Sequence, residues 1–284
     1  MWYIFIFLSV LFVSGANIFD KILSGQINRE KVVMTRYFWA VSILIIFLIF
    51  TTSLPTFWIP GILLMCLGVL NYLILLAMYR GLEHTHTGLF FVVGYLYIPF
   101  LYYINIALFW ESEVLDIYKF IIWILFLMTV SFLVYITGKK MQIVSLWSYF
   151  YALLCAIGWM LSIGWSAYVV KHAIIPPLHI FFYEALGSLM FATIVYTFRR
   201  KESLSFAFIT SWQPLMWGIF LALGLWLLLE SYRYLPANVV NILSLSDLIV
   251  TTIFSYLILH EKFEKKIILI IWLAFILLIS FAFV

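Results

Sequence analysis

The chain is divided into ten apolar runs, each about long enough to cross a membrane as a helix. The runs lie near residues 2–19, 32–52, 57–79, 86–110, 117–137, 145–170, 178–198, 208–232, 237–259 and 265–284. A bilayer core about 30 Å thick needs roughly 20 helical residues per crossing. The runs lack the sustained alternation of apolar and polar residues that is typical of a membrane β-barrel. They therefore predict an all-α polytopic membrane protein with ten transmembrane helices.

The composition excludes several other classes of protein. Hydrophobic residues make up 67% of the chain and charged residues 10%, whereas soluble domains average roughly 45–50% and about 25%. The net charge of +4 is too dilute for a nucleic-acid-binding surface. Cys66 and Cys155 lie inside apolar runs, so neither a disulfide framework nor a metal site is expected. Because the connecting loops are short, we expect no soluble catalytic domain, no enzymatic activity and no cofactor.

Basic residues are distributed unevenly among the loops. Loops after the odd-numbered runs hold twelve lysines and arginines, whereas loops after the even-numbered runs hold three, Lys119, Lys171 and Arg233. Loops rich in lysine and arginine face the cytoplasm. We therefore expect an integral protein of the cytoplasmic (inner) membrane with both termini outside.

Two short motifs recur at matched places in the two halves. Tyr79-Arg80-Gly81-Leu82 ends the third run, and Tyr232-Arg233-Tyr234-Leu235 ends the eighth. Each is followed by a further run that an acid closes, Glu111 in one case and Glu261 in the other. Because five spans is an odd number, the second half would have the opposite membrane orientation. We expect a 5+5 inverted repeat, with residues 1–140 as the first five-helix unit and 141–284 as the second.

The last quarter of the chain carries the motifs of a known family. They are Tyr232-Arg233-Tyr234-Leu235-Pro236-Ala237-Asn238, Ser246-Asp247-Leu248 and Leu259-His260-Glu261. With the five-plus-five arrangement, they resemble EamA-type members of the drug/metabolite transporter superfamily. Asp247 stands where such members often have glutamate, Leu248 where they have proline, and His260 where they have glycine. The resemblance implies a transporter whose cavity is lined by helices one, three, four, six, eight and nine.

Charged side chains inside apolar runs are candidates for function, because a charge at the bilayer centre costs about 2.5–3.5 kcal/mol. Asp247 is the deepest carboxylate, and it could exchange a proton; the alternative is a structural acid paired to a cation on another helix. Arg36 and Glu184 occupy roughly equivalent places in the two halves. They could pair with each other across a pseudo-two-fold axis, or they could flank a zwitterionic ligand.

Amide side chains add a second set of candidates, since buried amides need partners. Asn17 and Asn71 lie in the first and third runs. In the ninth run, a polar stripe with a spacing of three residues would face protein or water rather than lipid; it comprises Asn238, Asn241, Ser244 and Asp247. Helix–helix hydrogen bonding is the alternative reading of this stripe. Trp159 in the sixth run could line the same cavity or anchor the helix at an interface.

These features favour a secondary active transporter that moves a small organic metabolite by alternating access, with Asp247 as the coupling or cargo-binding acid. Amino-acid-like or other zwitterionic cargo is the hypothesis that the mixed charges and aromatic residues suggest. The expected partners are this small molecule, membrane lipid and protons, with no nucleic acid, for a monomer or homodimer. The alternatives are a lipid-headgroup flippase or membrane enzyme at the acidic cluster Glu111, Glu113 and Asp116, and a channel.

Overall fold

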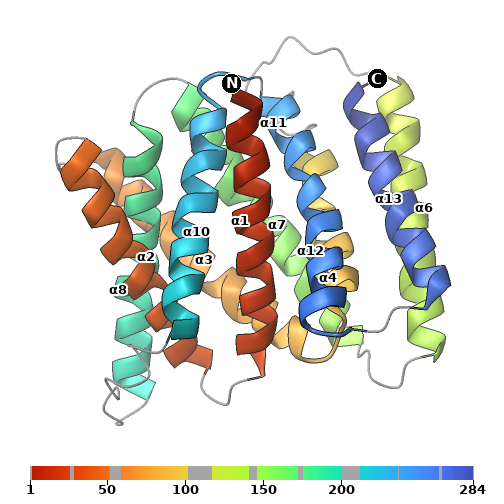
Figure 1. Ribbon diagram of the computed structural model, residues 1–284, viewed down its shortest axis with the longest axis horizontal. Coiled ribbons are helices and arrows are strands. Elements are labelled where there is room, and N and C mark those ends of the chain that lie inside the picture. The colour runs from red at the N-terminus through yellow and green to blue at the C-terminus, as the bar shows by residue number, and fades with distance from the viewer. Residues whose placement is uncertain are drawn as a thin grey trace.

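The computed structural model is a bundle of helices (Figure 1). It describes residues 2–25, 29–51, 59–101, 117–140, 146–171, 175–199, 212–235, 237–261 and 264–283. All regular secondary structure within these ranges is helical: α1 (Trp2–Ser24), α2 (Arg29–Thr51), α3 (Ile59–Glu83), α4 (Thr87–Gly94), α6 (Ile117–Lys140), α7 (Leu146–Lys171), α8 (Pro177–Arg199), α10 (Trp212–Ser231), α11 (Ala237–Ser244), α12 (Ser246–Ile258) and α13 (Lys265–Phe283).

Eight helical segments in this part of the chain are long and apolar enough to cross a membrane. They confirm the prediction of an all-helical protein with many membrane spans. The first run extends further than expected, because α1 continues to Ser24 rather than ending at residue 19. Of the predicted span 86–110, the described part ends at Leu101. The beginning of α1 and the end of α13 lie at the same end of the bundle (Figure 1).

Each helix of the first half packs on helices of the second half. Helix α1 packs against α10, and α7 packs against α3. In the same way, α2 packs on α10 and α8 on α3, while α1 packs on α12 and α7 on α4. Helices α6 and α13 lie side by side at one edge of the bundle (Figure 1). The centre of the bundle is therefore built from both halves.

Glycines allow two of these helix pairs to approach closely. A Cβ atom added at Gly68 of α3 would lie 2.2 Å from the carbonyl oxygen of Glu184 in α8. A Cβ atom at Gly218 of α10 would lie 2.6 Å from the Cβ of Trp39 in α2. Both contacts leave no room for a methyl group, so glycine is required for helix packing at these places.

Two helices are interrupted beside the centre of the bundle. Helix α4 ends at Gly94, and a single turn at Tyr95 precedes further helix up to Leu101. Pro99 explains this break, because its ring would clash with the carbonyl group four residues earlier, that of Tyr95. The predicted span 237–259 is divided at Leu245 into α11 and α12. There, the Ser244 hydroxyl donates to the Asn241 carbonyl at 2.7 Å, a bond that bends helices.

The end of α12 reaches the beginning of α4. His260 has a φ of 53°, the left-handed conformation that glycine adopts without cost. This turn places the Glu261 carboxylate on the first residue of α4, where it accepts bonds from the Thr87 amide at 3.2 Å and the Thr87 hydroxyl at 3.0 Å. Glu261 thus caps α4 from a distant part of the chain.

Candidate functional site

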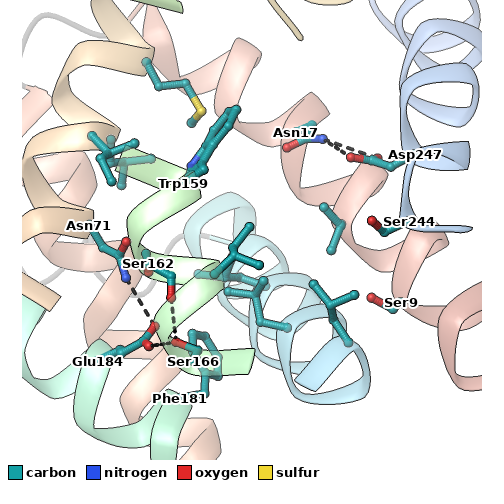
Figure 2. A pocket seen from close by; sticks show the side chains of 18 of the residues that line it. Ser9, Asn17, Asn71, Trp159, Ser162, Ser166, Phe181, Glu184, Ser244 and Asp247 are labelled. Atoms are coloured by element: carbon teal, nitrogen blue, oxygen red, sulfur yellow. Dashed lines mark hydrogen bonds between the residues drawn. The ribbon is translucent and has the colours of Figure 1, made fainter. Parts of the chain in front are cut away.

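A cavity of about 190 Å³ lies at the centre of the bundle. A dry cavity of about 150 Å³ holds benzene, so this one has room for a small organic solute. Both halves of the chain line it: Ser9, Val10, Val13, Asn17, Asp20, Arg36, Tyr37, Asn71, Ile74, Leu75, Met78, Phe91, Tyr95, Tyr97, Trp159, Ser162, Ile163, Ser166, Phe181, Glu184, Ala185, Leu221, Leu225, Leu228, Leu229, Ser244 and Asp247. Most of the lining surface is apolar, and polar side chains such as Asn17, Glu184 and Ser244 lie on several sides of the cavity (Figure 2).

Asp247 lies in the first turn of α12, directly after the break. Its side chain is buried and accepts four side-chain hydrogen bonds. Asn17 donates to Oδ2 at 3.1 Å and Thr251 to Oδ1 at 2.8 Å, and the hydroxyls of Ser14 and Tyr95 donate as well. The acid therefore connects α1, the interruption of α4, and α12.

Arg36 and Asp20 form a buried ion pair between α2 and α1. Arg36 Nη1 lies 2.9 Å from Asp20 Oδ1, and the Tyr79 hydroxyl donates to the same oxygen at 3.0 Å. The guanidinium also stacks over the Trp217 ring, 3.5 Å from its centroid. Its Nε has no hydrogen-bond partner in the described part of the chain, although Arg36 is only 7% exposed. The cavity thus contains a cation with one donor unused.

Glu184 lies on the opposite side of the cavity from Asp247 (Figure 2). Its carboxylate accepts a hydrogen bond from Ser166 of α7, and the Asn71 amide of α3 donates at 3.3 Å. The Ser166 hydroxyl also lies 2.9 Å from the Ser162 carbonyl. Glu184 is 6% exposed. In the described ranges, Glu184 and Asp247 form no ion pair with lysine, arginine or histidine.

The remaining predicted residues occupy different positions. Ser244 and Trp159 line the cavity, and the Trp159 ring is stacked on Phe91 with centroids 6.0 Å apart. Asn241 is buried behind the lining, where it accepts a hydrogen bond from the Tyr232 hydroxyl at 2.5 Å. Asn238 belongs to α11, but its side chain lies outside the described residues. The stripe on the ninth span is therefore described from Asn241 to Asp247.

The structure brings together seven predicted residues around one cavity: Asp247, Ser244, Trp159, Arg36, Glu184, Asn17 and Asn71. The predicted pairing of Arg36 with Glu184 is not formed, because Asp20 is nearer to Arg36 and holds it. The sequence interpretation missed Asp20, Ser14 and Tyr95. Asp20 was the one that a signal could have revealed, since Asn17, Asp20 and Ser24 continue a helical spacing past the predicted end of the first span.

Glu230 and Arg233 form a local ion pair at 3.1 Å near the end of α10. The acidic cluster of Glu111, Glu113 and Asp116 lies outside the described residues. Within the described residues, no group of three or more histidine, cysteine, aspartate or glutamate side chains could hold a metal ion.

Comparisons with known proteins agree with this architecture. Residues 146–282 match the EamA-like transporter family. A solved structure described as "Crystal structure of protein" superposes with a TM-score of 0.64, covering 97% of this chain and 98% of that chain at 13% identity. At this identity the likeness concerns the fold alone. A search of curated proteins gave no significant match.

Proposed function

Because residues 146–282 form an EamA-like transporter domain, we propose that the protein is a secondary active transporter that works by alternating access between two five-helix halves. This family transports small molecules across membranes and is not enzymatic, in line with the expectation from the motifs. The observation that carries the proposal is one central cavity in which buried acids and a guanidinium from both halves meet.

The proposal of two inverted halves is supported by matched helix pairings. Exchanging α1, α2, α3 and α4 for α7, α8, α10 and α12 converts each main contact into another observed contact. Local contacts follow the same rule: Ser9 donates to the Gly224 carbonyl at 2.8 Å, and Cys155 donates to the Ile74 carbonyl at 3.4 Å. In transporters built this way, cargo binds between the repeats, beside interrupted helices.

The proposed cargo is a small zwitterion of the amino-acid type. Asp247 offers a carboxylate for an ammonium group, and the guanidinium of Arg36, which also lines the cavity, offers a positive charge for a carboxylate group. The apolar wall around Trp159 and Phe91 suits a short apolar or aromatic side chain. The cavity is only slightly larger than the one that binds benzene, so it favours a compact solute. Asp247 serves as the cargo-binding or coupling acid, and protons are the proposed coupling ion.

The test is transport by purified protein in proteoliposomes. Radiolabelled L-leucine and L-phenylalanine are the probes, with glucose as the uncharged control and an imposed pH gradient as the driving force. We expect gradient-dependent movement of at least one amino acid and none of glucose. Asp247→Asn is expected to reduce this transport at least tenfold, whereas Glu230→Gln, outside the cavity, leaves it unchanged.

Three outcomes would each contradict a part of the proposal. Amino-acid transport that is insensitive to Asp247→Asn removes this acid from the mechanism. Movement of amine-only or carboxylate-only compounds, with amino acids excluded, contradicts the zwitterion. A lipid scrambled between leaflets at the same rate as in wild type, without any solute transport, favours the flippase instead.

A further inference from the structure

The two acids that line the cavity without a cationic partner differ in how their oxygen atoms are occupied. An ionised carboxylate has about four acceptor positions and no donor, whereas a protonated carboxyl group needs an acceptor for its own hydrogen. The hydrogen-bond partners of Asp247 and Glu184 therefore reveal which protonation state each environment fits.

The surroundings of Asp247 fit an ionised carboxylate. Four donors surround it, so its acceptor positions are filled. The bonds of Thr251 are consistent with this, because its hydroxyl accepts from Asn17 at 3.2 Å and directs its one hydrogen to Asp247. A proton on Asp247 would have to turn one of these hydroxyls from donor to acceptor. The other acceptor open to the Ser14 hydroxyl, the Asp247 carbonyl, is 3.4 Å away, farther than the 2.9 Å that separates Ser166 from its alternative acceptor.

The surroundings of Glu184 fit a proton. The Ser166 hydroxyl has one hydrogen, and the Ser162 carbonyl lies 2.9 Å from its oxygen as an acceptor. When Ser166 donates to that carbonyl, it presents a lone pair to Glu184, which can then be the donor. The other neighbour, Asn71, makes one long bond of 3.3 Å. Glu184 therefore has unused acceptor capacity when ionised and an acceptor for its hydrogen when protonated.

Within the described ranges, no cation of the protein pairs with a negative charge on Glu184. Helices α3 and α7 present neutral Asn71, Ser162 and Ser166 to it. From α2, the titratable or charged groups on the cavity are Arg36 and Tyr37. Arg36 is held by Asp20 of α1, which cancels its charge. A buried carboxylate with no cation beside it is costly, so a proton is the natural counter-charge.

We propose that the two acids divide the work: Glu184 takes up and releases the coupling proton, while Asp247 remains the fixed negative charge for the cargo. This rests on the proposed function and assigns its coupling step to one residue. On the side where the cavity is open, hydronium transfers its proton to a Glu184 oxygen, forming an O–H bond and leaving water. The carboxyl group then donates to Ser166 Oγ. Release on the other side reverses the transfer to water.

A spectroscopic measurement tests the assignment without any cargo. Infrared difference spectra of the purified protein in lipid, recorded across a pH titration, report the carbonyl stretch of protonated carboxyl groups. We expect a titrating band in wild type that Glu184→Gln abolishes and that Asp247→Asn and the surface control Glu230→Gln retain. Loss of the band in Asp247→Asn, with retention in Glu184→Gln, overturns the proposal.

A second variant tests whether the number of hydrogen-bond donors is what keeps Asp247 ionised. Removing two donors from Asp247, in Ser14→Ala/Thr251→Val, is expected to add a second titrating carboxyl band. If this variant shows no second band, the number of donors does not keep Asp247 ionised, and the proposed difference between the two acids is contradicted. This variant also serves if Asp247→Asn fails to fold.

Transport measurements separate failure of this inference from failure of the proposed function. With L-leucine as probe, Glu184→Gln is expected to retain exchange of internal for external leucine at equal pH, and to lose accumulation driven by a pH gradient by at least tenfold. Loss of both activities overturns the division of work. If wild type transports no leucine, the proposed cargo fails, and the infrared assignment of Glu184 still stands or falls by itself.

Discussion

In the proposed inverted repeat, the helix pairs α1–α2 and α7–α8 correspond to each other, and each contributes an acid to the cavity lining. In α1–α2 that acid is Asp20, which is bonded to Arg36 sixteen residues later. In α7–α8 it is Glu184, which is bonded to Ser166 eighteen residues earlier. The first site carries its own counter-charge, and the second has neutral partners. The cavity lining thus contains a buried ion pair from α1 and α2 and an acid with neutral partners from α8.

The Asp20–Arg36 pair is therefore needed for stability, whereas Glu184 is not held by any such pair in the described part of the chain. A buried ion pair is held by mutual attraction, and removing one partner leaves a charge that the interior cannot solvate. A buried acid with neutral partners loses little when it becomes an amide, because its hydrogen-bond partners remain. The two sites should therefore respond very differently to substitution.

The largest expected effect is on the ion pair. Arg36→Met leaves Asp20 buried without a cation and is expected to lower the free energy of unfolding by about 3–5 kcal/mol. Glu184→Gln keeps the same shape and is expected to change it by less than about 1 kcal/mol. Denaturant unfolding in mixed micelles measures both. Recovery of most of the loss in Asp20→Asn/Arg36→Met is the control, and equal losses in Arg36→Met and Glu184→Gln contradict the comparison.

The correspondence between the pairs can be tested at their glycine contacts. Gly68→Ala, facing α8, and Gly218→Ala, facing α2, are each expected to destabilise the protein by about 1–3 kcal/mol through overpacking. Gly68→Ala should have the larger effect, because its methyl group meets the backbone of Glu184 and Ser188, whereas Gly218 first meets a side-chain atom. The same unfolding assay applies. Gly25→Ala is the matched control, since nothing lies within 4 Å of its Cβ position.

A smaller effect is expected from the neutral donors. Tyr79→Phe removes the 3.0 Å bond to the ionised Asp20 and is expected to cost about 1.5 kcal/mol. Asn71→Leu removes the 3.3 Å bond to Glu184 and should cost less, about 0.5 kcal/mol. Thermal unfolding of both variants in the same lipid mixture ranks them. The reverse order would mean that Glu184, and not Asp20, carries the larger charge.

The smallest effect is expected at the surface. Glu230→Gln breaks the pair with Arg233, which is about half exposed, and should change the free energy of unfolding by about 0–1 kcal/mol. This variant sets the scale for a partly exposed ion pair against the buried one at Arg36. A cost above about 2 kcal/mol would mean that exposure is not what distinguishes the two pairs.

Periodicity and composition were sufficient to predict the class of fold. Long apolar runs must be helices in lipid, because every backbone group needs an internal partner there. The same reasoning marked Asp247, Arg36 and Glu184, since charged groups in such runs are rare and must face protein or water. Their gathering around one cavity follows from that requirement.

The hydrogen-bond partners of these residues could not be predicted from the sequence. Ser14 and Asp247 are 233 positions apart, and which helices lie side by side depends on packing across the whole bundle. Asp20 was missed because a single acid at the end of an apolar run is also typical of a loop. The interruption at Leu245 has no proline behind it, so the pattern of residues predicts a continuous helix there.

The hydroxyl of Tyr95 belongs to one interrupted helix, and the acid that accepts its hydrogen belongs to the other. A tilt of either segment about its break would therefore strip Asp247 of a donor, and anything that occupies Asp247 would favour some tilts over others. These two effects are thermodynamically reciprocal. If cargo at Asp247 favours one tilt of the interrupted helices, that tilt must raise the affinity for the cargo by the same factor.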